Sequence, residues 1–78
     1  MEQTYIQEER SILLRRAIQK LKPEYRQILW LIYFEGFTNR EAAVIMKRST
    51  HSVETLVYRA KRALRAQLDE EDFIYEEL

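Results

Sequence analysis

The stretch from Thr38 to Arg65, TNREAAVIMKRSTHSVETLVYRAKRALR, determines the fold that we predict for this chain. Thr38 and Glu41 have the spacing of a capping box, in which each side chain accepts a hydrogen bond from the other residue's backbone N–H. A short helix is therefore expected from Asn39 to about Met46. Its inner face is small, because alanines stand at positions 42 and 43, and another helix can cross over it closely.

A second, longer helix is predicted directly after this one. Lys47 and Arg48 interrupt the apolar period, and the polar run STHS at 49–52 offers hydroxyl caps for a new helix start. The apolar stripe of the new helix consists of Val53, Val57, Ala60 and Leu64, spaced by three and four. Its other faces carry Glu54, Thr55, Tyr58, Arg59, Lys61, Arg62 and Arg65. This is the pattern of a helix-turn-helix, whose second helix can enter a DNA major groove.

Two further helices are predicted before this unit. After a frayed end at residues 1–4, a helical period runs from Tyr5 to Leu21. Its apolar side consists of Ile6, Leu13 or Leu14, Ala17, Ile18 and Leu21. The pair Lys22-Pro23 marks a boundary, because the residue before proline avoids helical geometry whereas proline suits a first helical turn.

The helix that begins at Pro23 is expected to reach about Phe34 and to lie at the centre of the core, since it is apolar on nearly every side. In so small a domain, part of Trp30 or Leu31 can remain exposed as a docking surface. Gly36 is the only glycine and stands where a helix end needs a left-handed residue. We therefore predict an all-α domain of four helices that ends in a helix-turn-helix.

Composition limits the possible functions. The 78 residues suffice for one small domain, and 46% hydrophobic with 33% charged residues is typical of a folded, helix-rich protein. The absence of cysteine excludes disulfides, thiolate metal sites and a cysteine nucleophile, and it fits a cytoplasmic protein. No apolar run approaches the roughly 20 residues of a membrane span. We expect no cofactor, because the single histidine, His51, has no cysteine or second histidine to share a metal.

The net charge of zero conceals an asymmetric distribution. All 13 Lys and Arg lie within residues 1–65, against seven acids there, which gives this part a charge of +6. The other six acids lie in the last ten residues. We therefore expect a basic domain over 1–67 and an acidic, mobile tail over 68–78. Aromatic residues interrupt the tail, and it is a hypothesis that residues 69–78 fold back over the DNA-binding helix or contact a partner.

The chain resembles region 4 of a bacterial sigma-70 factor, most closely of the extracytoplasmic-function type. The resemblance extends from about Leu14 to Gln67. Its motifs are the helix boundary LKPEYRQI, the turn and capping box YFEGFTNREA, and the segment SVETLVYRAKRALR, in that order. The promoter-melting region 2 of a full sigma factor has no room in 78 residues, so the chain looks like an excised or free-standing fourth region.

This resemblance implies two binding surfaces. In the family, the second helix of the helix-turn-helix reads the promoter −35 element, and the apolar side of the domain holds the flap of the RNA polymerase β subunit. The implied groove-facing residues are Glu54, Thr55, Tyr58 and Arg59, and the implied phosphate contacts are Asn39, Arg40, Thr50, Ser52 and Arg62. A cationic helix that releases counterions and reads base edges is consistent with that role.

Four residues depart from the family pattern. Glu54 stands where many members have Lys or Arg, and Leu56 replaces a frequent Arg, so we expect weak DNA binding by the isolated domain. Lys47 occupies the usual glycine of the turn, a left-handed position that costs roughly 1 kcal/mol for a residue with a Cβ. Arg48 replaces an aliphatic residue, and its stem can still pack.

Three classes of function remain open on the sequence. The first is promoter recognition, and the second is a protein-binding module that holds the polymerase flap or an anti-sigma factor and touches DNA weakly. The third, an enzyme, has no support, since the sequence offers no nucleophile-base pair, metal cluster or glycine-rich phosphate loop. A response-regulator type of helix-turn-helix is close to the first class. The basic helix face can also be a solvated surface without function. We expect a monomer.

Overall fold

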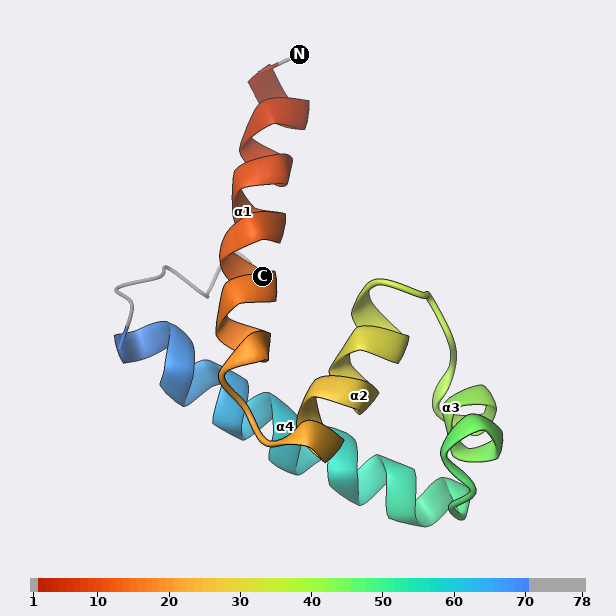
Figure 1. Ribbon diagram of the computed structural model, residues 1–78. Coiled ribbons are helices and arrows are strands. Elements are labelled where there is room, and N and C mark those ends of the chain that lie inside the picture. Colours follow the sequence, from red (N-terminus) through yellow and green to blue (C-terminus); the bar gives the residue numbers. More distant parts are fainter. Residues whose placement is uncertain (1, 71–78) are drawn as a thin grey trace.

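The computed structural model describes residues 2–70, with side chains from residue 11 onward. Within this range the chain forms four helices and no strand, which confirms the predicted all-α architecture (Figure 1). The helices are α1 (Glu2–Gln19), α2 (Pro23–Tyr33), α3 (Asn39–Met46) and α4 (Thr50–Glu70). No described helix combines the length and the apolar character needed to cross a membrane.

The first helix differs from its prediction at both ends. It begins at Glu2 rather than Tyr5, because residues 2–4 contain no residue that breaks a helix. It ends at Gln19, two residues before the predicted Leu21. A turn with hydrogen bonds between residues three apart follows, from the Lys20 N–H to the Ala17 carbonyl and from the Leu21 N–H to the Ile18 carbonyl. The chain leaves the helix early because Lys22 is extended (φ −60°, ψ 154°), as a residue before proline must be.

The ends of α2 follow from its proline and from the only glycine. Pro23 occupies the first helical position, where a missing N–H has no cost. Gly36 has φ +76°, so the predicted left-handed conformation is confirmed. The Phe37 N–H then donates to the Leu31 carbonyl at 3.0 Å, which turns the chain back along the end of α2.

The capping box at the start of α3 is confirmed in both directions. The Thr38 N–H donates to Glu41 Oε1 at 2.9 Å, and the Glu41 N–H donates to Thr38 Oγ1 at 3.1 Å. The bond from the Thr38 backbone, and secondarily that with its side chain, lowers the pKa of the Glu41 carboxyl below its usual 4.5. The box is therefore complete above that pH and weakens when acid protonates Glu41.

The turn between α3 and α4 closes on Lys47, which is left-handed (φ 57°, ψ 47°) as predicted. The Arg48 N–H donates to the Ala43 carbonyl at 2.9 Å and the Lys47 N–H to the Val44 carbonyl at 3.3 Å, the bond pattern of a Schellman motif. The next helix starts at once, because Ser49 Oγ accepts from the Ser52 N–H at 3.0 Å.

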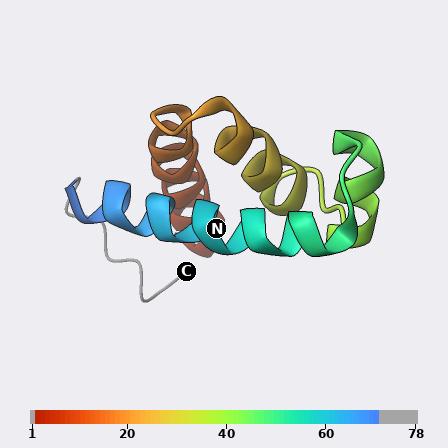
Figure 2. The same ribbon diagram turned by 90° about the horizontal axis from the view of Figure 1, so that it is seen from below.

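The core forms where α1, α2 and α3 pack along one side of α4 (Figure 2). The predicted stripe of α4 is buried, and Leu68 extends it at 0% exposure. The alanines of α3 are buried as well, which lets α3 approach α4 closely. The buried residues are Ala17, Ile18, Ile28, Leu29, Ala42, Ala43, Val53, Leu56, Val57, Ala60, Leu64 and Leu68. Because α4 continues to Glu70, its end lies beyond residue 67, and the division of the chain at that residue stays a prediction.

We predict that Lys47→Gly raises the free energy of unfolding by about 1 kcal/mol, because glycine adopts the left-handed conformation without a Cβ clash. Gly36→Ala should lower it by a similar amount. An added Cβ at residue 36 meets no atom within 4 Å, so only the backbone conformation opposes the substitution. Urea unfolding of both variants measures this, and a destabilised Lys47→Gly variant would contradict the prediction.

Candidate nucleic-acid interface

Four of the predicted DNA-binding residues share one strip of α4. At about 100° per residue, Thr55, Tyr58, Arg59 and Arg62 fall within an arc of about 100°, on the side of the helix opposite the buried stripe. Tyr58, Arg59 and Arg62 are exposed and Thr55 is half-buried. We call this strip the recognition arc. It combines a hydroxyl, a phenol and two guanidinium groups, which suits contacts with base edges and phosphates.

Two members of the recognition arc are held together. The Arg62 guanidinium carbon lies 5.9 Å from the centre of the Tyr58 ring, within the range of a cation–π contact. Tyr58 is 64% exposed, so this pair orders a large aromatic group on the open surface of the helix. The N–H donors of Arg62 remain at the surface, where a phosphate can reach them.

The other predicted contacts lie at helix starts or at the margin of the recognition arc. Asn39 and Arg40 occupy the first turn of α3, and Thr50 and Ser52 the first turn of α4. Backbone N–H groups at helix N-termini favour a phosphate, so these positions suit backbone contacts. Glu54 is exposed but lies about 100° from Thr55 around the helix, outside the recognition arc.

Leu56 lies in the core and does not face the DNA groove. The resemblance to the family implies a groove position with a missing cation there, which is wrong, because the Leu56 side chain is only 5% exposed and belongs to the core. The physical reason is helical periodicity, since Leu56 lies three residues after Val53 and four residues before Ala60, and both of these are buried. Leu56 therefore stabilises the packing of α4 and does not weaken its outer face.

A polar groove of about 270 Å³ lies between the start of α2 and the first half of α4. Its central contact, which no sequence pattern predicts, is an ion pair at 3.0 Å between Arg48 and Glu24, and Ser52 Oγ accepts from the same guanidinium at 3.4 Å. The unusual Arg48 at an aliphatic position of the family was the available signal. We call this space the α2–α4 groove, and it is lined by Lys22, Glu24, Tyr25, Arg48, Ser52, Thr55, Leu56 and Arg59.

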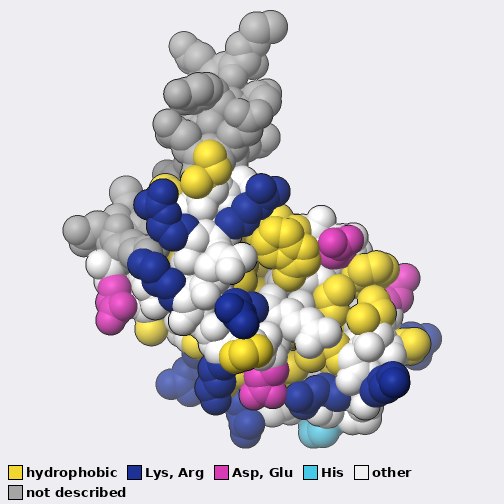
Figure 3. Space-filling view, in the orientation of Figure 1, with side chains coloured by type: hydrophobic (Ala, Val, Ile, Leu, Met, Phe, Trp, Pro, Cys, Tyr) yellow, Lys and Arg dark blue, Asp and Glu magenta, His cyan; other side chains and the backbone are white. Residues whose placement is uncertain are grey.

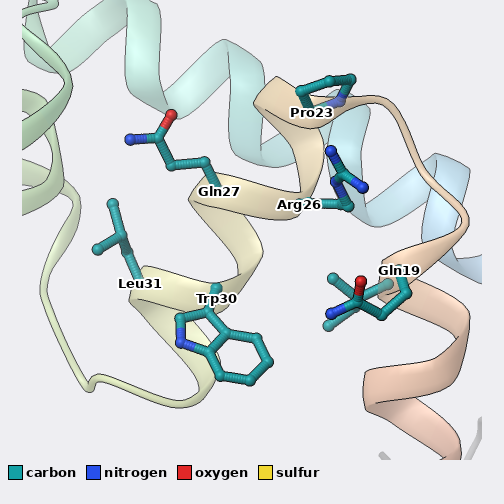
Figure 4. A pocket seen from close by; sticks show the side chains of 7 residues that line it. Gln19, Pro23, Arg26, Gln27, Trp30 and Leu31 are labelled. Carbon is teal, nitrogen blue, oxygen red and sulfur yellow. The ribbon is translucent and has the colours of Figure 1, made fainter.

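A second groove, of about 390 Å³, lies between the end of α1 and one face of α2 (Figure 4). Trp30 and Leu31 contribute its apolar part and are half-buried, so the predicted partial exposure is confirmed. We call it the α1–α2 groove, and it is lined by Ile18, Gln19, Pro23, Arg26, Gln27, Trp30 and Leu31. Figure 3 shows a hydrophobic patch between α1 and α2 with Lys and Arg side chains around it.

The indole of Trp30 is held by its neighbours. Its ring centre lies 4.6 Å from that of Phe34, and the two rings are tilted by 42°. The Arg15 guanidinium carbon lies 5.7 Å from the Trp30 ring and 5.1 Å from the Phe34 ring, so α1 supplies a cation to both. This arrangement gives the α1–α2 groove an ordered aromatic wall. Among the described residues, no group of three or more His, Asp or Glu side chains is placed to hold a metal ion.

Comparison with known proteins agrees with this geometry. Residues 11–64 match the protein family described as Sigma-70, region 4. Over 59 residues, the chain is 37% identical to the RNA polymerase sigma factor SigV of Bacillus subtilis (strain 168). That alignment covers 76% of this chain and 36% of the relative, so the chain spans about a third of the length of the curated relative it matches. No solved structure matches the chain.

We predict that Leu56→Ala lowers the free energy of unfolding by about 2 to 4 kcal/mol, because it leaves a cavity in the core. The matched control is Leu13→Ala, at a position that is 36% exposed, and it should cost much less. Thermal or urea unfolding compares the two. Equal stability of Leu56→Ala and the unmodified chain would place Leu56 on the surface instead.

Proposed function

The chain belongs to the sigma-70 region 4 family, and on that premise we propose that it recognises the −35 element of promoter DNA within RNA polymerase. The observation that carries the proposal is the recognition arc, in which Thr55, Tyr58, Arg59 and Arg62 share the outer strip of α4. An α-helix fits the major groove, where base edges present a distinct pattern for each base pair. In this proposal the protein catalyses no reaction and acts in the cytoplasm.

Within this proposal the residues have different tasks. Thr55 and Tyr58 are suited to base edges, because they lie on the outer strip in the first half of α4, the part of a recognition helix that contacts bases. Arg59 faces the groove from the same strip, and Arg62 neutralises a phosphate. The residues at the starts of α3 and α4, Asn39, Arg40, Thr50 and Ser52, fix the register. Glu54, at the margin, can accept from a cytosine amino group or limit the affinity by repelling phosphate.

The α1–α2 groove is our candidate for docking on the β flap of RNA polymerase. Its apolar wall of Trp30 and Leu31 suits an amphipathic helix that inserts apolar side chains. The same groove supports the second candidate function, a module that binds the flap or an anti-sigma factor and touches DNA weakly. The family match favours a sigma region 4 over a response-regulator type of helix-turn-helix.

We expect the full chain to bind a fluorescent promoter-like duplex weakly, with an affinity that falls steeply with salt, because phosphate contacts release counterions. Arg62→Gln should lower the affinity and reduce the slope of log affinity against log salt by about 0.9. Lys61→Gln removes the same charge outside the recognition arc and is the matched control. Fluorescence anisotropy at two salt concentrations measures both variants. An absence of duplex binding at either salt would contradict promoter recognition.

A peptide with the sequence of the flap-tip helix should bind the α1–α2 groove and shift the emission of Trp30, which is the only tryptophan, to shorter wavelength as the indole loses water. Gln27→Lys, an exposed change in the groove, should weaken this binding. Gln67→Lys, near the end of α4 and outside the groove, is the control. Peptide binding without DNA binding would favour the protein-binding alternative, and an unshifted emission would contradict flap docking at this groove.

A further inference from the structure

The α2–α4 groove carries an excess of positive charge. Three cations line it, Lys22, Arg48 and Arg59, against a single carboxylate, Glu24. A concave site whose lining has a net charge of this sign focuses the electric field and attracts an anion. The hydroxyls of Ser52 and Thr55 add further hydrogen-bonding groups to its wall.

Two contacts fix the position of the Arg48 side chain in this groove. Its guanidinium donates to Glu24 Oε2 at 3.0 Å and to Ser52 Oγ at 3.4 Å, which connects the start of α2 with the first turn of α4. The two side chains of the ion pair are 36% and 43% exposed, so solvent and ligands reach them. A guanidinium carries more N–H donors than these contacts use, and its planar fork matches the geometry of a phosphate.

The groove adjoins the recognition arc. Thr55 and Arg59 belong to both, and Ser52 lies about 60° from Thr55 around α4, toward α2. A helix inserted in a major groove has the phosphates of the duplex along its flanks, and contacts with them orient the helix without reading sequence. The α2–α4 groove occupies such a flank.

We propose that the α2–α4 groove binds one backbone phosphate of the duplex that α4 reads, and that Arg48 is its principal contact. This inference rests on the proposed function. Glu24 holds the guanidinium in place when DNA is absent, and the phosphate displaces this carboxylate when DNA binds. Lys22 and Arg59 supply the remaining charge. Arg48 is thus a DNA-binding residue outside the set predicted from the sequence, and Glu24 is its competing counter-ion.

The test compares Arg48→Gln, Glu24→Gln and the control Arg16→Gln, which removes a cation from α1, outside both grooves. Arg48→Gln should weaken binding several-fold, equally for promoter-like and scrambled duplexes, and should reduce the salt slope by about 0.9. Glu24→Gln should strengthen binding at low salt, since it removes the competitor. Equal losses in Arg48→Gln and Arg16→Gln would overturn the phosphate site while leaving the proposed function intact.

A titration with inorganic phosphate separates this site from the proposed function. In NMR spectra of the full chain, phosphate should shift the amide signals of residues 22–25 and 48–52, and Arg48→Gln should abolish the shifts. The spectrum of Arg48→Gln also shows whether the variant is folded. If no duplex binds but these shifts occur, the anion site stands and promoter recognition fails. Unchanged signals at these residues would overturn the site.

Discussion

The packing of α2 against α4 is the contact on which the rest of the structure depends. Ile28 and Leu29 of α2 are fully buried and the residues of the buried stripe of α4 are at most 8% exposed, and this is the most extensive contact between any two described helices. In a domain this small, each buried side chain is a large share of the core. Because α1 and α3 both pack on this pair, the position of the outer face of α4 follows from it.

The same two helices divide the surface into separate faces. One side of α2 enters the core, while the side with Trp30 and Leu31 closes a groove against α1. One side of α4 enters the core, while the opposite side carries Tyr58 and Arg62 in the open. A helix has enough circumference for both contacts, so one small core supports a cationic outer strip on α4 and an exposed apolar groove beside α2.

The charged residues are distributed unevenly along the chain. The chain as a whole is neutral, yet residues 2–70 contain all 13 of its Lys and Arg and only nine of its 13 acids. Individual ion pairs on so exposed a surface contribute little to stability. The ion pair between Arg48 and Glu24 matters for its position and not for its contribution to stability, because it joins the turn of the helix-turn-helix to α2 at the margin of the recognition arc.

Local chemistry in the sequence determined where three of the four helices begin and which kind of fold they form. Pro23, the Thr38–Glu41 capping box and the Ser49 hydroxyl act through adjacent backbone groups, so these helix starts could be predicted without the fold. The roles of Leu56 and Arg48 could not be predicted in this way. The resemblance to the family predicts Leu56 on the outer face of α4 and predicts that the aliphatic part of Arg48 packs. In the tertiary structure Leu56 is buried, and Arg48 pairs with Glu24, 24 residues away. Such contacts depend on how the helices cross, which no local pattern encodes.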